Sequence, residues 1–260
     1  MSDEVLHLLP PPCDARVAYG ADPSQFGEIR MPRGSGPFPV VMNIHGGYWR
    51  AKYDLVHAGH LCAGLTAQQV ATWNVEYRRV GNPGGGWPGT FDDIRSAYRF
   101  LPELAKSYPV DSTKALVIGH SAGGQLALCL AAHEASLKRV VALAGVVDLQ
   151  QAWELCLSDG AVADFLGGKP STVPEHYRNA DPMQLAIDRS TTQWLIHGAA
   201  DDVVPSYFSQ SYAEQKKKRG EEVHYMGIST AGHFELIDPY SSAWPTVENT
   251  VLHLLGVKGG

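Results

Sequence analysis

A serine between two glycines is the residue of this chain best suited to act as a nucleophile. The pentapeptide GHSAG at residues 119–123 follows an apolar, β-branched run over residues 114–118 and precedes an alanine- and leucine-rich stretch over residues 125–135. This pattern indicates a strand, a tight turn and a helix, and the glycines let the backbone turn sharply with the hydroxyl exposed. We therefore predict that Ser121 attacks an electrophilic carbon.

A base and an acid must accompany such a serine, because its hydroxyl reacts slowly at neutral pH until an oriented base accepts the proton. The segment HGAADDVVP at residues 197–205 places Asp201 on the loop after a predicted strand. A strand-like run over residues 223–228 leads into STAGHF, which presents His233 among small residues. Since catalytic groups gather at the carboxyl ends of parallel strands, the pattern predicts a triad of Ser121, Asp201 and His233.

Two other carboxylates compete with Asp201 for the role of the acid. Asp202 is its immediate neighbour, and we expect it to face solvent or to cap the next helix. Asp148 lies just past the predicted strand over residues 140–144 and stays an alternative, because it too follows the carboxyl end of a predicted strand.

Backbone amides that could hold a negatively charged oxygen flank the same serine. The amide of Ala122 follows the nucleophile at a predicted helix N-terminus, where the helix dipole favours negative charge. The glycines of HGGYW at residues 45–49 follow another predicted strand, and without side chains their N–H groups can approach a ligand closely. Candidates for the oxyanion hole are therefore Gly46, Gly47 and Ala122.

Aromatic and histidine side chains are expected around the site. Tyr48 and Trp87 are the best candidates for a pocket that holds the acyl or leaving group, because they lie in loops predicted to surround the serine. Core packing is an equal alternative for any one aromatic residue. His45 and His197 each precede a glycine at a strand end, and we expect them to orient their loops through hydrogen bonds.

Four motifs follow one another along the chain: HGGYW at 45–49, GHSAGG at 119–124, HGAADDVVP at 197–205 and AGHF at 231–234. Together they resemble the α/β-hydrolases, in particular the HGGxW group of carboxylesterases and arylformamidases, and the resemblance extends from about residue 25 to 255. It implies Ser121 as nucleophile, Asp201 as acid and His233 as base. Tyr48 stands where lipases and esterases of the HGGG type have a third glycine, which favours the HGGxW group.

Short apolar runs alternate with longer helical segments, which predicts an α/β fold with a mostly parallel sheet flanked by helices. Predicted strands occupy residues 40–44, 70–76, 115–119, 140–144, 193–197 and 223–228, and predicted helices occupy 54–68, 91–107, 122–135, 207–219 and 243–255. Residues 15–21 and 25–31 are predicted to form an antiparallel pair at the sheet edge. The resemblance implies the same architecture, the α/β-hydrolase fold.

One region breaks this alternation. Residues 147–189 contain two short helical pieces, around 149–157 and 161–167, followed by irregular sequence rich in Pro and Asn. We predict that this insertion forms a small helical cap over the carboxyl edge of the sheet. The whole chain, residues 1–260, is expected to form a single domain around that sheet.

Composition restricts the partners. The net charge is −6 at pH 7 and basic residues are scattered apart from the run KKKR at 216–219, which disfavours nucleic acid. No apolar run reaches the ~20 residues of a membrane helix, and the acidic start lacks the basic residues of a secretion signal, so we expect no membrane partner and a cytoplasmic location. The four scattered cysteines and the HxxH at 57–60 predict neither a disulfide framework nor a metal site.

These observations predict a serine hydrolase that cleaves a carboxylic ester, or an activated amide, of a small acyl compound through an acyl-enzyme without a cofactor. An arylformamidase acting on N-formylkynurenine is the main alternative, and a peptidase related to prolyl oligopeptidase is a weaker one. A non-catalytic ligand-binding module or an acyltransferase on the same fold represents a different class. The sequence does not fix the oligomeric state.

Overall fold

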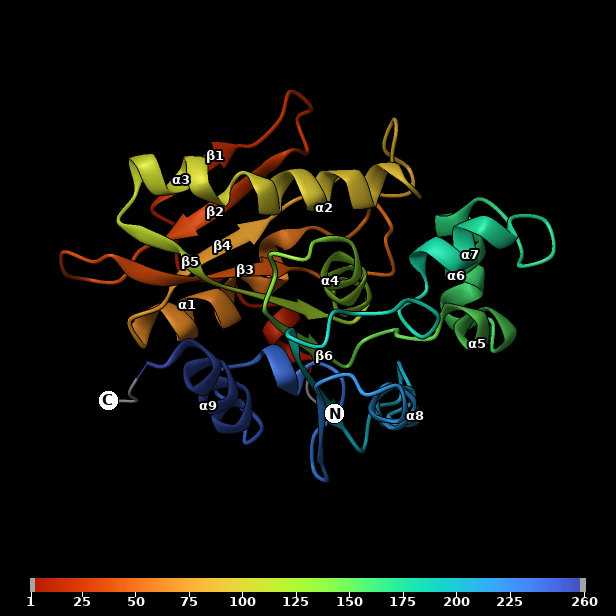
Figure 1. Cartoon of the computed structure of the whole chain (residues 1–260). Coiled ribbons are helices and arrows are strands. Elements are labelled where there is room, and N and C mark those ends of the chain that lie inside the picture. Colours follow the sequence, from red (N-terminus) through yellow and green to blue (C-terminus); the bar gives the residue numbers. More distant parts are fainter. Residues whose placement is uncertain (1–2, 258–260) are drawn as a thin grey trace.

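A computed structural model describes residues 3–257 and arranges them around one eight-stranded sheet (Figure 1). The strands are β1 (Ala15–Ala18), β2 (Phe26–Arg30), β3 (Phe38–Ile44), β4 (Ala71–Val75), β5 (Val110–His120), β6 (Arg139–Leu143), β7 (Thr192–Gly198) and β8 (Val223–Ile228). Their order is β1-β2-β4-β3-β5-β6-β7-β8, with β2 antiparallel to both neighbours and the remaining neighbours parallel. The predicted α/β class with a mostly parallel sheet is confirmed.

The register brings the carboxyl ends of the central strands together. Ile44 at the end of β3 pairs with Gly119 of β5, and Gly119 pairs with Ala142 of β6. In turn, Leu143 of β6 pairs with Ile196 of β7. The loops that carry the sequence motifs therefore leave the sheet side by side, although the motifs are far apart along the chain.

Helices cover both faces of the sheet (Figure 1). The α-helices are α1 (Gly59–Ala67), α2 (Gly89–Arg99), α3 (Leu101–Ser107), α4 (Ala122–His133), α5 (Leu149–Glu154), α6 (Leu157–Leu166), α7 (Pro174–Ala180), α8 (Tyr207–Lys218) and α9 (Trp244–Leu255), and the short 3₁₀ turns are η1 (Glu4–Leu6), η2 (Leu55–Ala58) and η3 (Glu235–Ile237). Apolar residues of α1 and α9 pack on one face, and those of α2, α3, α4 and α8 pack on the other. None of the helices within residues 3–257 is long and apolar enough to cross a membrane.

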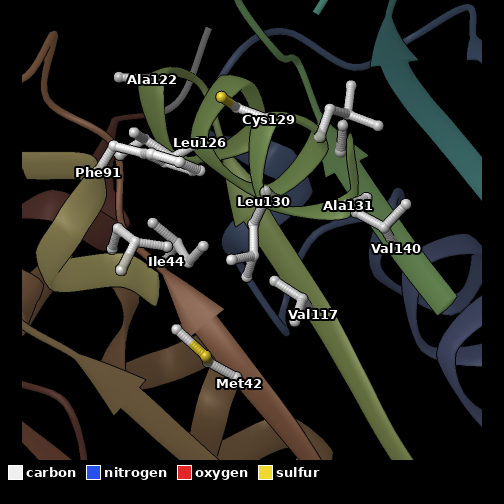
Figure 2. Packing of buried hydrophobic residues seen from close by; sticks show 14 of the residues in the cluster. Met42, Ile44, Phe91, Val117, Ala122, Leu126, Cys129, Leu130, Ala131 and Val140 are labelled. Carbon is white, nitrogen blue, oxygen red and sulfur yellow. The ribbon is translucent and has the colours of Figure 1, made fainter. Parts of the chain in front are cut away.

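Alternate residues of each central strand supply the two cores. In β3, Met42 and Ile44 belong to the core under α4, whereas Val41 belongs to the core under α1 and α9. Figure 2 shows Leu126 and Leu130 of α4 beside these β3 residues, and all of them are fully buried. Burying one such side chain contributes about 2 kcal/mol, so the α4 contact fixes the helix that begins directly after Ser121.

Two helices differ from the sequence-based prediction. The helix expected over residues 91–107 is broken into α2 and α3, because Pro102 lacks an N–H group and its ring would clash with the carbonyl of Tyr98 in a continuous helix. Residues 174–180 form α7, where irregular sequence was expected. Pro174 occupies the first turn of α7, where its missing N–H costs no hydrogen bond.

The inserted segment contains α5, α6 and α7, which lie together at one side of the molecule in Figure 1. The start of α6 is strained, because Ser158 and Asp159 have φ angles of 49° and 54°, each costing about 1 kcal/mol for a residue with a Cβ atom. The Arg50 side chain reaches this turn from the loop after β3 and donates to the Ser158 carbonyl at 2.7 Å. A second contact joins Arg50 to Asp164 at 3.3 Å.

A buried carboxylate, Asp181, joins two parts of the inserted segment, the start of α5 and the chain after α7. Asp181 is 1% exposed, and its Oδ1 accepts from the backbone N–H groups of Leu149 and Met183, both at 3.1 Å. Its Oδ2 accepts from the Gln184 side chain at 3.1 Å. These bonds hold the start of α5 against the chain that follows α7.

Replacing Asp181 by asparagine is expected to remove a component of the stability that decreases as pH rises. Burial above all, with a contribution from the nearby Asp148 charge, raises the pKa of Asp181 from 3.8 to about 6. Because this folded-state pKa exceeds the unfolded value, its contribution to the free energy of unfolding is present below the unfolded pKa and is lost as pH rises through about 6. The change corresponds to about 3 kcal/mol.

Urea unfolding at about pH 4.5 and 7.5 measures this effect. The difference between the two pH values should change in D181N, because the variant lacks the component that falls with rising pH. The exposed Asp92, replaced in the same way, is the matched control and should leave the difference as in the wild type. An unchanged difference in D181N would contradict the raised pKa.

Candidate active site

Ser121 occupies a strained turn between β5 and α4, with φ 56° and ψ −120°. This conformation is unfavourable for a residue with a Cβ atom, and a bond from Ser121 N–H to the Leu143 carbonyl, at 2.8 Å, helps to hold it. A Cβ atom at Gly119 would lie 2.1 Å from the Gly123 carbonyl oxygen. A Cβ atom at Gly123 would lie 2.0 Å from the Ile44 carbonyl oxygen. Only glycine fits at either position, which explains the GxSxG pattern.

The structure brings Asp201 and His233 together from the loops after β7 and β8. His233 Nδ1 lies 2.7 Å from Asp201 Oδ2, and Asp201 Oδ1 accepts from the N–H groups of Val203 and Val204 at 2.9 and 2.8 Å. Burial opposes ionisation of Asp201, but hydrogen bonds from His197 and His233 outweigh it and hold its pKa well below the ordinary value. The ionised carboxylate accepts from Nδ1–H of His233, which leaves the lone pair on Nε2.

The two alternative acids lie elsewhere. Asp148 accepts from Gln151 N–H at 2.9 Å and so caps the N-terminus of α5. Asp202 is exposed. Of the three carboxylates considered, Asp201 is the one that the structure places against His233.

A cavity of about 590 Å³ contains both Ser121 and His233 in its wall. Its other walls come from the loop after β3, from η2, from Phe234 and from the N-terminal residues Leu6 and His7. The inserted segment contributes Ser158 alone to the lining. The serine and the histidine therefore face one shared space that is large enough for a small organic molecule.

The two aromatic residues predicted for the pocket have different positions. Tyr48 lines the cavity and its hydroxyl donates to the Val203 carbonyl at 3.0 Å. Burial first, and then the Asp201 charge, raises the pKa of Tyr48 to about 12, so its hydroxyl is neutral. The expectation for Trp87 is corrected: its ring stacks on Phe91 at 5.2 Å and meets Phe165 at 6.2 Å, because its loop is bonded to the end of α6.

The peptide between Gly46 and Gly47 has a fixed orientation. His45 Nδ1 lies 2.8 Å from the Gly46 carbonyl oxygen. Since the C=O and N–H of one peptide point in opposite directions, the Gly47 N–H points away from His45, and Gly47 lines the cavity. Gly46 lies behind Ser121, where a Cβ atom would come within 3.1 Å of the serine Cβ. Ala122 begins α4, and the first N–H groups of a helix have no partner within the helix.

A buried carboxylate that the sequence analysis did not single out supports this loop. Glu76 accepts from His45 Nε2 at 3.2 Å, from Arg79 at 3.1 Å and from the backbone N–H groups of Tyr77 and Leu55 at 2.8 and 3.1 Å. Burial would raise its pKa, but the neighbouring His45, Arg79 and Tyr77 outweigh burial and lower it. The position of Glu76 at the end of a strand beside the HGG loop is the signal that could have identified it.

The cavity also contains residues that carry no local sequence signal. His57 of the HxxH pattern lines it, and burial, followed by the nearby His45, lowers the pKa of His57 to about 4, so its ring is neutral at pH 7. The second histidine of that pattern, His60, lies 3.2 Å from the Leu8 carbonyl oxygen. Leu6 and His7 reach the cavity only through the tertiary fold.

Comparison with known proteins gives relatives over most of the chain. The BD-FAE family model matches residues 28–217. Esterase LipC of Mycobacterium tuberculosis is 27% identical over 248 residues, which cover 86% of this chain and 60% of that protein. A kynurenine formamidase of Meyerozyma guilliermondii is 32% identical over 113 residues, 43% of this chain and 40% of that protein. The chain thus spans less than two thirds of the length of either relative.

Solved structures share the fold at lower sequence identity. A truncated form of carbohydrate esterase from gut microbiota is similar with a TM-score of 0.81 and 19% identity, and the alignment covers 96% of this chain and 100% of that one. At this identity the likeness shows the fold alone, which is the predicted α/β-hydrolase fold. The family match covers well over half of the chain, and the chain therefore belongs to the BD-FAE family of α/β-hydrolases.

Proposed function

We propose that this protein hydrolyses a carboxylic ester of a small acyl compound through an acyl-enzyme on Ser121. The observation that carries the proposal is the 2.7 Å contact between His233 and Asp201 beside a cavity that Ser121 shares. His233 Nε2 accepts the hydroxyl proton as Ser121 Oγ attacks the carbonyl carbon, and the alcohol leaves with that proton. Water then attacks the acyl-enzyme by the same route and releases the acid.

The N–H groups of Gly47 and Ala122 are the proposed donors to the tetrahedral oxyanion. The bond between His45 and the Gly46 carbonyl supports the direction of the Gly47 N–H, and the α4 dipole favours negative charge at Ala122. Each such donor is expected to lower the activation free energy by about 3 kcal/mol. Gly46 supplies space for the serine in this proposal rather than a donor, and the chemistry requires no cofactor.

A small or medium acyl group suits the proposed site. Leu6, Val56 and Phe234 give the cavity apolar surface, whereas Lys52 and Asp54 give it a polar side. The similarity to LipC supports ester hydrolysis, and the similarity to the kynurenine formamidase supports an arylformamidase as the second candidate.

Labelling with a fluorophosphonate tests the nucleophile. An activated serine forms a stable phosphonyl adduct, so we expect one label on the tryptic peptide 115–138, which contains Ser121 and the control residue Ser136. Fragmentation of this peptide should place the adduct on Ser121. An adduct on another residue, or no adduct on active protein, would overturn the proposed mechanism.

A panel of substrates tests the class of reaction. Rates on p-nitrophenyl acetate, N-formylkynurenine and an aminoacyl naphthylamide are compared at equal enzyme concentration, and the ester is expected to react with the highest kcat/KM. A preference for N-formylkynurenine would select the arylformamidase. Tight binding of an ester without turnover would select a binding module instead.

A further inference from the structure

Two histidines share one oxygen of Asp201. The Oδ2 atom lies 2.7 Å from Nδ1 of His233 and 3.2 Å from Nε2 of His197. His197 also approaches the Val204 carbonyl oxygen at 2.9 Å, and its side chain is fully buried at the end of β7. Of the two histidines, only His233 lines the cavity.

The hydrogen-bond partners of His197 fix its proton. Asp201 Oδ2 and the Val204 carbonyl oxygen only accept, so the ring hydrogen is on Nε2. The other nitrogen, Nδ1, lies 2.8 Å from the hydroxyl of the buried Ser209 in α8. A neutral ring lets Ser209 donate to Nδ1, whereas an imidazolium would leave the Ser209 hydrogen without this acceptor. His197 thus donates to the acid through Nε2.

We propose that His197 is a positioning residue that holds the Asp201 carboxylate for His233 and takes up part of its negative charge. This inference rests on the proposed function, because it assigns Asp201 to the triad. Two N–H donors compete for one oxygen, so each bond is weaker than it would be alone. Without His197, the carboxylate turns more freely and its whole charge acts on His233.

Other titratable groups lie near His233 and must be distinguished from His197 when the pH profile is interpreted. The His120 ring centroid lies 4.5 Å from that of His233, and His57 and Tyr48 line the same cavity. Burial lowers the pKa of both His120 and His57 and raises that of Tyr48, so all three are neutral near pH 7. Further ionisable side chains nearby are Glu235 in η3 and, in the cavity wall, His7, Lys52, Tyr53 and Asp54.

The test compares H197L with H197Q over the pH profile of ester hydrolysis. Glutamine can donate to Asp201 through Nε2 and accept from Ser209 through Oε1, whereas leucine can do neither. Leucine is expected to lower kcat about 10-fold with KM within about two-fold. It should also move the acid limb of kcat/KM to higher pH by about half a pH unit, because a fuller charge on Asp201 stabilises the inactive imidazolium of His233. Glutamine should restore both values.

A purely structural role would give a different result. Loss of kcat without movement of the acid limb, or a glutamine variant that behaves like the leucine variant, would overturn the inference. S209A provides a second variant if the leucine variant does not fold, because Ser209 touches His197 without touching Asp201. It is expected to move the acid limb in the same direction by a smaller amount.

Proton NMR without substrate separates this inference from the proposed function. The resonance of His233 Nδ1–H should shift to lower field in H197L and return in H197Q, because the hydrogen bond to Asp201 strengthens when the competitor is removed. If the resonance shifts in H197L and returns in H197Q but the wild type hydrolyses no ester, the proposed function fails and the inference about the shared oxygen stands. If the wild type hydrolyses esters but the resonance is the same in all variants, the inference alone fails.

Discussion

Replacing Ser121 with alanine is expected to lower kcat for p-nitrophenyl acetate at least about 10⁴-fold. The variant lacks the oxygen that would form the proposed acyl-enzyme, and we expect the remaining rate to come from substrate binding and from the proposed donors, the amides of Gly47 and Ala122, acting on attack by water. Alanine keeps a Cβ atom in the strained turn at φ 56°, so the fold and the stability should change little. Steady-state kinetics, with urea unfolding as a check on the fold, measures both quantities.

The control for this variant is S158A, because Ser158 also lines the cavity but comes from the inserted segment. Its kcat is expected to stay within about three-fold of the wild type. An S121A protein that keeps more than a small fraction of the wild-type turnover would show that another group attacks the substrate. Equal losses in both variants would point to general damage to the cavity.

Changing Asp201 to asparagine is expected to lower kcat about 10⁴-fold while Ser121 stays intact. Asparagine Oδ1 can still accept from Val203 and Val204, but its amide N–H groups then face Nδ1 of His233. His233 must place its hydrogen on Nε2 to accept from this amide. That nitrogen can then no longer take the proton of Ser121.

Asp202, the exposed neighbour, provides the matched control, and D202N should keep kcat within about two-fold of the wild type. D148N extends the comparison to the carboxylate that caps α5. If D148N or D202N lost as much turnover as D201N, the contact between Asp201 and His233 would not be the one that catalysis requires.

Much of the fold follows from local pattern. The strands β3 and β6 and the buried second half of β5 could be predicted from apolar runs, whereas the partly exposed first half of β5 was missed. The glycines around Ser121 reflect close backbone contacts that no other residue allows. The break between α2 and α3 and the existence of α7 were missed because Pro can either end a helix or begin one. Its effect depends on which turn it occupies, and this is decided by packing.

The sequence predicted those residues of the candidate site that lie within the four motifs. The residue types, chain order and spacing pointed to Asp201 rather than Asp202, but Asp148 stayed an alternative, because the choice depends on the 2.7 Å approach of His233. Trp87 was placed in the pocket because its loop was predicted to surround the serine, whereas the position of that loop is set by contacts with Phe165.

The residues that contact the candidate site from outside its motifs could not be identified from local sequence pattern. Glu76 contacts His45, which precedes the glycines of the candidate site, and Leu6 reaches the cavity from near the N-terminus. Contacts of this kind arise between residues that are distant in sequence, so neither periodicity nor spacing reveals them.

The guanidinium of Arg50 joins the loop that carries Gly47 to the inserted segment. Arg50 lies two residues after Tyr48 in the loop that carries Gly47, and its Nη2 atom donates a hydrogen bond to the carbonyl oxygen of Ser158. Displacing this turn would break that hydrogen bond, so the positions of the turn and of the loop that carries Gly47 depend on one another. Substitutions that displace this turn are therefore expected to loosen the loop whose Gly47 amide is the proposed oxyanion donor.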